Sequence, residues 1–114
     1  MTDWLVTVAA AKAAPIPEGR RSAELMRHGS MTLRYYAPYR VDPQTPHDQD
    51  EFYIVHSGRG AVLVGTTEDT LERKPFGPGD AIFVRAGQIH RFVDFTVDFA
   101  TWVVFWGPAG GEAP

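Results

Sequence analysis

Short apolar segments separated by turn residues fill the chain from Glu51 onward. The segments predicted as strands are 51–56, 61–65, 70–76, 81–85, 89–93 and 97–106. Turn signals recur roughly every eight to twelve residues with almost no helical pattern between them, which is typical of an all-β domain. The pattern therefore predicts about eight or nine strands, paired antiparallel in a sandwich or barrel.

The N-terminal third has a weaker pattern. An alanine-rich stretch from Asp3 to Ala14 predicts a short helix, capped by Thr2 or Asp3 and ended before Pro15. An irregular connector is expected to follow over residues 15–21.

A hairpin is predicted after the connector. Its strands, 23–27 and 31–36, flank the turn His28-Gly29-Ser30. Prolines interrupt the following stretch, 37–47, so we expect a loop or a frayed edge strand there.

The strand that begins at Glu51 has two distinct faces. Alternation places Glu51, Tyr53 and Val55 on one face. The other face carries Phe52, Ile54 and His56. Both faces are largely apolar, as they are in 102–106. We therefore expect one face to fill the barrel and the other to pack on a second sheet or another subunit, which favours a homodimer.

Length and composition indicate one compact domain. The 114 residues are 44% hydrophobic, enough for a single core. We expect an N-terminal helix and connector over 1–22, a barrel over 23–107 and a tail over 108–114.

Charge and hydropathy argue against several partners. A net charge of −3 with both signs interspersed gives no basic surface for nucleic acid. No apolar run approaches the ~20 residues that cross a bilayer, and Asp3 stands where a leader would be basic. We therefore expect a cytoplasmic protein without nucleic-acid or membrane partners. The absence of cysteine leaves histidine, carboxylate or water as metal ligands.

Histidine and carboxylate groups gather just before the strand at Glu51. In one continuous strand His47 and Glu51 would stand ~13 Å apart, too far to share an ion whose ligands lie at about 2.0–2.2 Å. The segment Asp48-Gln49-Asp50 tolerates a turn, and a reversal there would bring His47 and Glu51 together. With His90, the other well-placed histidine, they would suit a divalent metal inside a small β-barrel.

Two spaced motifs resemble those of the cupin superfamily. His47, Glu51 and Gly58 match the second half of the pattern G-x5-H-x-H-x3,4-E-x6-G, and Gly79-x5-Arg85-x-Gly87-x2-His90-x3-Asp94 resembles G-x5-P-x-G-x2-H-x3-N. Both occur in order in a strand-rich context, and the resemblance covers 35–106. It implies a small single-domain cupin with an antiparallel β-barrel of the double-stranded β-helix, or jelly-roll, type after a short helix.

The resemblance implies a metal site with a reduced ligand set. Thr45 stands at the first motif histidine, so the usual three histidines and one glutamate become His47, Glu51 and His90. Gln49 is a candidate for a weak further ligand. Two histidines and a carboxylate suit non-haem Fe(II), and Mn, Zn or Ni are also acceptable.

The functional expectation is a metal-dependent enzyme that acts on a small oxygen-bearing metabolite, of the dioxygenase, decarboxylase or isomerase type. Glu51 would be both ligand and proton acceptor, and Tyr53, on the same face, is the second catalytic candidate. The alternatives are a non-catalytic binding or sensing module with a structural metal or none, and a domain that only dimerises. The histidines and Glu51 could also be ordinary structural residues.

Three further residues receive simpler interpretations. His28 is read as a turn residue and His56 as an outer-face or interfacial residue, because neither has a partner at ligand spacing. Arg85 could hold a substrate carboxylate, but an arginine beside a turn is more often solvated.

Overall fold

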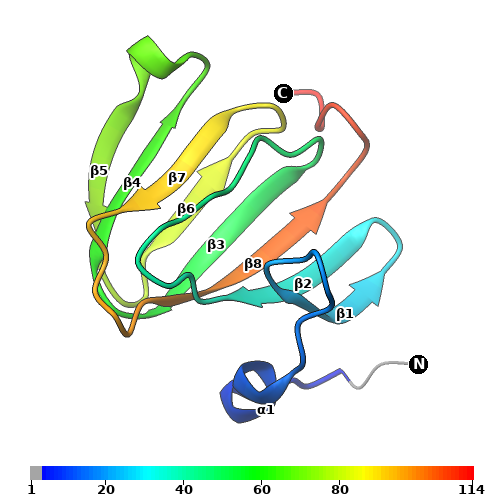
Figure 1. The fold of residues 1–114 in the computed structure, drawn as a ribbon. Coiled ribbons are helices and arrows are strands. Elements are labelled where there is room, and N and C mark those ends of the chain that lie inside the picture. The colour runs from blue at the N-terminus through cyan, green and yellow to red at the C-terminus, as the bar shows by residue number, and fades with distance from the viewer. Residues whose placement is uncertain (1–3) are drawn as a thin grey trace.

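The computed structural model describes residues 4–114 and folds them into eight strands and one short helix (Figure 1). The strands are β1 Ala23–His28, β2 Met31–Tyr36, β3 Asp50–Ser57, β4 Gly60–Gly65, β5 Glu72–Phe76, β6 Ala81–Val84, β7 Ile89–Val93 and β8 Ala100–Trp106. The helix α1 spans Val8–Ala13, and a 3-10 turn, η1, spans Glu68–Thr70. None of the helices in this described part is long and apolar enough to cross a membrane.

The strands form two antiparallel sheets that face each other (Figure 1). The larger sheet has the order β1-β2-β8-β3-β6, and the smaller has the order β5-β4-β7. Within residues 4–114 no strand pairing joins the two sheets, so the barrel is a pair of facing sheets and not a closed cylinder. The predicted all-β antiparallel fold with a short N-terminal helix is confirmed.

An aromatic core fills the space between the sheets. The larger sheet contributes Tyr53, Val55, Val84 and Val103, the smaller sheet contributes Val62, Phe76 and Phe92, and Phe99 enters from the loop before β8. Close packing of these rings holds the two sheets together.

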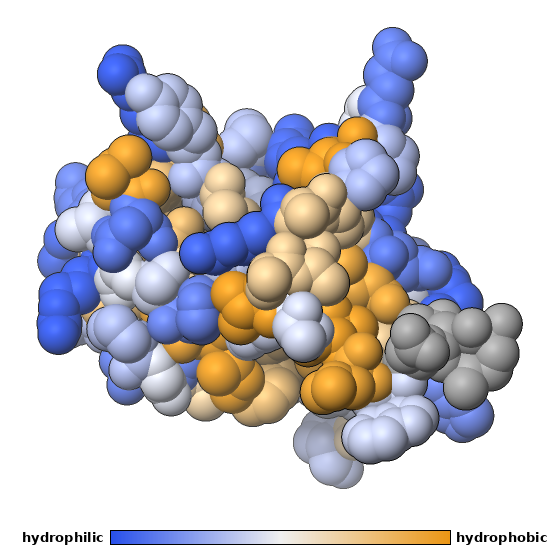
Figure 2. Space-filling view, turned by 90° about the horizontal axis from the view of Figure 1, so that it is seen from below, coloured by the Kyte–Doolittle hydropathy of each residue, from blue (hydrophilic) through white to orange (hydrophobic). Residues whose placement is uncertain are grey.

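The predicted alternation in β3 is confirmed. Glu51, Tyr53 and Val55 are almost completely buried on the inner face. On the outer face, Phe52, Ile54 and His56 are partly exposed. Part of the larger sheet's outer face is covered by the chain's own helix, because Ala11 of α1 packs against it. Figure 2 shows hydrophobic residues gathered toward one side of the face that is seen from below.

The helix differs from its prediction. It begins at Val8, and Thr7 is the cap, with its hydroxyl accepting a hydrogen bond from the Ala10 N–H at 3.1 Å. Residues 4–7 are not helical, so the prediction of a helix from Asp3 onward is wrong over these residues. The predicted caps, Thr2 and Asp3, lie outside the described residues. A threonine side chain that satisfies a free N–H of the first turn defines where a short helix begins.

Two strands start later than predicted. β5 begins at Glu72 because the preceding residues form η1, and β8 begins at Ala100 because Phe99 N–H closes a turn onto Thr96 O at 3.0 Å. The eight strands lie within the predicted number. The division of the chain at residues 22 and 107 stays a prediction.

Candidate metal centre

Three side chains predicted as ligands come together between the sheets. One ligand atom each from His47, Glu51 and His90 lies within 4.8 Å of the others. Glu51 Oε2 is 3.2 Å from His90 Nε2 and 3.7 Å from His47 Nε2. The convergence of His47 and Glu51 predicted from the turn between them is therefore confirmed.

Hydrogen bonds to the backbone hold the two segments that carry the ligands next to each other. The His47 carbonyl accepts a hydrogen bond from Gly87 N–H at 2.7 Å, in the turn that leads into β7. The Asp50 carboxylate accepts from Ala86 N–H and from Glu112 N–H, both at 2.9 Å. The start of β3 is thereby tied to the start of β7, which carries His90. Gly87 has a φ of +82°, a conformation that favours glycine.

The orientation of His90 leaves one ring nitrogen free to accept a proton or a cation. His90 Nδ1 lies 3.1 Å from the Gln88 carbonyl, which can only accept, so Nδ1 carries the proton of a neutral ring. Nε2 then presents a lone pair to the Glu51 oxygen. His90 Nε2 and His47 Nε2 are both buried without a hydrogen-bond partner in the described residues. Such facing acceptors require a shared proton or a metal ion, so these residues fit a divalent metal.

Polar side chains lie behind Glu51, and the Tyr53 hydroxyl orients it. The Tyr53 hydroxyl lies in hydrogen-bond contact with Glu51 Oε1, which leaves Oε2 toward the imidazoles. Gln44 Oε1 lies 3.1 Å from the same hydroxyl. Gln44 is held in turn by Asp42, which accepts from the Gln44 side-chain amide at 2.8 Å and from Phe92 N–H at 2.7 Å. Tyr53 is therefore a neighbour of the ligand set, as its strand face predicted.

Burial sets the protonation of these groups. Burial raises the pKa of Glu51 to about 7, an effect that the Tyr53 hydrogen bond opposes. Burial, reinforced by the nearby His90, lowers the pKa of His47 to about 4. Burial also lowers the pKa of His90 and raises that of Tyr53. At neutral pH both imidazoles are therefore neutral, the form that binds metals.

The remaining candidates lie away from this cluster. The Gln49 amide nitrogen donates to Ser30 O at 3.2 Å and to Gly107 O at 2.9 Å, and its role as a weak ligand stays a prediction. Thr45 is exposed. His28 is exposed at the end of β1, and His56 lies on the outer face with its ring centroid 6.0 Å from that of Tyr35.

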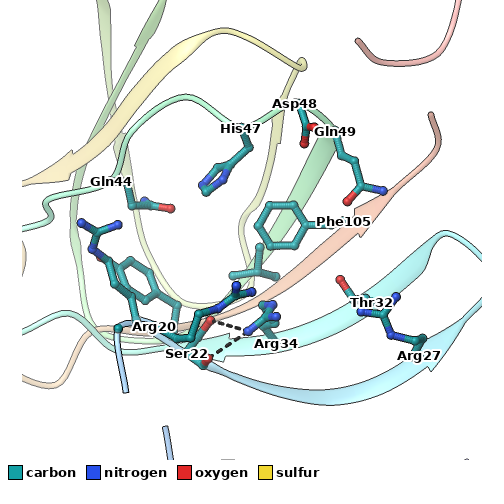
Figure 3. A pocket seen from close by; sticks show the side chains of 14 residues that line it. Arg20, Ser22, Arg27, Thr32, Arg34, Gln44, His47, Asp48, Gln49 and Phe105 are labelled. Atoms are coloured by element: carbon teal, nitrogen blue, oxygen red, sulfur yellow. Dashed lines mark hydrogen bonds between the residues drawn. The ribbon is translucent and has the colours of Figure 1, made fainter. Parts of the chain in front are cut away.

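A cavity of about 420 Å³ adjoins the centre, and His47 is the member of the ligand set that lines it. Figure 3 shows His47 and Gln44 on one side of the cavity and Arg34 on the other. Arg85, the arginine considered from sequence, is exposed and lines a different hollow.

Sequence reasoning missed the groups behind the ligands and around the cavity. Asp42 and Gln44 lie in a proline-rich loop with no periodic pattern. Arg34 carried a usable signal, because alternation in β2 places it on the same face as Thr32 and Tyr36.

Comparisons with known proteins agree with this architecture. The family model described as "Cupin domain" matches residues 32–105. The uncharacterized protein SCO3923 of Streptomyces coelicolor is 36% identical over 87 residues, which span 75% of this chain and 78% of that protein.

Solved structures of low sequence identity share the fold. BH2720 from Bacillus halodurans has a TM-score of 0.70 at 19% identity, covering 98% of this chain and 85% of its own. A Cupin 2 conserved barrel domain protein from Salinispora arenicola has a TM-score of 0.64 at 20% identity, covering 94% and 90%. Hydroxypropylphosphonic acid epoxidase from S. wedmorenis has a TM-score of 0.63 at 16% identity, covering 93% of this chain and 61% of the epoxidase.

Proposed function

Since this chain belongs to the cupin family, we propose that it binds a divalent metal through His47, Glu51 and His90 and acts on a small oxygen-bearing metabolite. The proposal rests on two buried Nε2 atoms, of His47 and His90, which have no hydrogen-bond partner within residues 4–114 and face one oxygen of Glu51. Fe, Mn, Zn and Ni are all compatible with this donor set.

A metal ion bound there would supply Lewis acidity and open coordination positions for an oxygen-bearing ligand. The chain's own residues prepare the site for it. Gln88 fixes the His90 ring through Nδ1, and Tyr53 directs one oxygen of Glu51 away from the imidazoles. Such outer contacts hold ligands in position and tune their basicity.

Glu51 is also suited to proton exchange. Its pKa of about 7 in the metal-free chain allows it to take up and release a proton near neutral pH. With a metal bound, Glu51 would accept a proton only if it dissociated from the ion. Tyr53 keeps its own proton because burial raises its pKa, so it stays a donor to Glu51. These properties are compatible with dioxygenase, decarboxylase or isomerase chemistry, and the fold does not choose among them. A structure of similar fold is that of the Fe(II) form of HppE with an alternative substrate.

The test of metal binding is elemental analysis of protein purified without chelator. We expect about one metal ion per chain, and loss of most of it in His47→Ala and in His90→Ala. His28→Ala is the matched control because His28 is exposed and is not part of the ligand cluster. Metal content unchanged in both ligand variants would contradict the proposal.

A non-catalytic binding or sensing module is the second candidate. The observation that favours it is the shielding of the centre, since Glu51 and His90 are each about 1% exposed and only His47 lines the cavity among the three ligands. Turnover or O₂ consumption by metal-loaded protein, over a panel of diketones, hydroxy acids and catechols, separates the two. Retained metal without turnover would favour the binding module.

The expected partners extend this proposal. A small molecule would occupy the cavity, and a homodimer would cover apolar surface such as Phe83, which is 53% exposed on β6. Light scattering measures the dimer directly. A cytoplasmic location stays part of the same proposal.

A further inference from the structure

Four arginines line the cavity beside the proposed metal centre. They are Arg20, Arg21, Arg27 and Arg34, and the lining carries one carboxylate against them, that of Asp48. This concentration of positive charge occurs in a chain whose net charge is −3. At about 420 Å³ the cavity has the size of a small-molecule site.

Arg34 is the central member of this group. It lies on β2 with its side chain 13% exposed, and Nη1 donates to the Ser22 carbonyl at 2.9 Å (Figure 3). The nearest carboxylate oxygen recorded for it, Glu24 Oε1, is 3.9 Å away and is engaged more closely by Arg27, at 2.5 Å. Arg34 is therefore a partly buried cation without a close counter-ion of its own, a costly arrangement unless an anion binds.

Arg20 and Arg21 add charge from a separate segment. A turn in which Arg20 N–H donates to Pro17 O at 3.0 Å, with Gly19 at a φ of +79°, brings this segment to the cavity. No carboxylate among residues 4–114 lies within ion-pair distance of Arg20 or Arg21. Their guanidinium groups are therefore available to a ligand.

The position of the arginines relative to His47 defines the shape of the ligand. Arg34 faces the cavity from one side and His47 from the other (Figure 3). A molecule held by its anionic end at Arg34 would direct its other end toward His47 and the metal centre. Guanidinium groups match carboxylate and phosphonate oxygens through paired hydrogen bonds.

We propose that the ligand of this cavity is a small anionic metabolite whose carboxylate or phosphonate-type group is bound by Arg34 with Arg20 and Arg21. As a statement about the substrate, this inference rests on the proposed function. The anion site itself is built from residues outside the metal ligand set.

The test uses three small probes that share a hydroxyl group: lactate, hydroxymethylphosphonate and the neutral lactamide. Calorimetric titration of metal-loaded protein is expected to detect at least one of the acids, with lactamide at least about tenfold weaker because it lacks the charge. The more tightly bound acid assigns the class as carboxylate or phosphonate. Binding of lactamide as tight as that of both acids, or no binding of either acid at millimolar concentration, would overturn the inference.

Variants locate the binding. Arg34→Gln is expected to weaken the acids by about tenfold or more and to leave lactamide unaffected. Arg21→Ala, in an exposed connector, provides the same test if Arg34→Gln does not fold, and Arg85→Ala is the control with an exposed arginine outside the cavity. Acid binding unchanged in both Arg34→Gln and Arg21→Ala would overturn the inference.

The metal site and the anion site can be tested independently of each other. The titrations are repeated on metal-free His90→Ala protein. Acid binding that still depends on Arg21 or Arg34 there supports the anion site even where elemental analysis contradicts the metal. Metal bound at His90 without arginine-dependent acid binding overturns the anion site alone.

Discussion

The interior of the barrel has an aromatic half and a polar half, and the two halves differ in how completely their groups are paired. The aromatic half consists of Phe76, Phe92, Phe95 and Phe99, whose rings pack at centroid distances of 4.8 to 5.5 Å. The polar half consists of Asp42, Gln44, Glu51, Tyr53 and His90. In the aromatic half the rings pack against one another, whereas the polar half leaves the Nε2 atom of His90 without a hydrogen-bond partner in the described residues.

Tyr53 forms the boundary between the halves. Its ring meets Phe92 edge-on at 5.1 Å, while its hydroxyl contacts Glu51. Folding and metal binding therefore depend on adjacent but separate contacts. Substitutions in the aromatic half should therefore change stability first, and substitutions in the polar half should change metal affinity first.

The largest effect is expected from Phe92→Ala. Phe92 is 2% exposed, and loss of its ring leaves a cavity that should lower the free energy of unfolding by about 3–5 kcal/mol. Urea denaturation of metal-free protein measures the change. Phe83→Ala is the control, since Phe83 is 53% exposed and should cost much less. Similar losses in the two variants would contradict the role of Phe92 in the core.

Glu51→Gln should have the opposite signature. Removal of the ligand charge is expected to weaken metal binding by more than about 100-fold. This loss exceeds the effect expected for a residue that only hydrogen-bonds to a ligand. At pH 8, above the Glu51 pKa of about 7, the wild-type chain buries a charged carboxylate, so the metal-free variant should be at least as stable. Competition with a metallochromic chelator and urea denaturation measure the two quantities. Glu72→Gln, at an exposed site, should change neither, and a metal affinity kept in Glu51→Gln would refute the ligand assignment.

Much of this polar half could be predicted from sequence because its signals are local. The two-residue period of β3 predicts the shared face of Glu51 and Tyr53, and turn-tolerant residues predict the approach of His47 to Glu51. His90 follows from the spacing of the second motif. Asp42 could not be predicted, because the Phe92 N–H that it binds is 50 residues away in the chain.

The start of the helix and the arginines that line the cavity could not be predicted from local sequence either. Thr7 competes with two other acceptable cap residues nearby, and only the folded chain decides among them. Arg20 and Arg21 lie in an irregular connector whose position depends on the rest of the fold, so no sequence period places them at the cavity.

Tyr53→Phe sharpens the role of the boundary residue. Without its hydroxyl, Glu51 Oε1 loses a hydrogen bond, and metal affinity should fall by about 10- to 100-fold. Tyr35→Phe is a close control, because the Tyr35 hydroxyl is buried and has no partner among the described residues. Equal metal affinities for the two variants would show that the Tyr53 hydroxyl does not position Glu51.

The smallest expected effect is the pH dependence of metal binding. Glu51 in the metal-free protein carries a proton below its pKa of about 7, and this proton must leave when metal binds. Metal affinity should therefore be nearly flat above about pH 8 and fall about tenfold from pH 6.5 to pH 5.5. His47, with its pKa lowered to about 4, should add nothing in this range. A slope of two or three protons, measured by calorimetry in buffers of different ionisation enthalpy, would contradict the neutral imidazoles.

X-ray absorption spectroscopy of the zinc-loaded chain tests the metal centre most directly. Two imidazole nitrogens and a carboxylate oxygen are expected at about 2.0–2.2 Å, with one imidazole fewer around any zinc that His90→Ala still holds at saturating zinc. A shell of oxygen ligands alone, or a spectrum unchanged when both His47 and His90 are replaced by alanine, would contradict the ligand assignment.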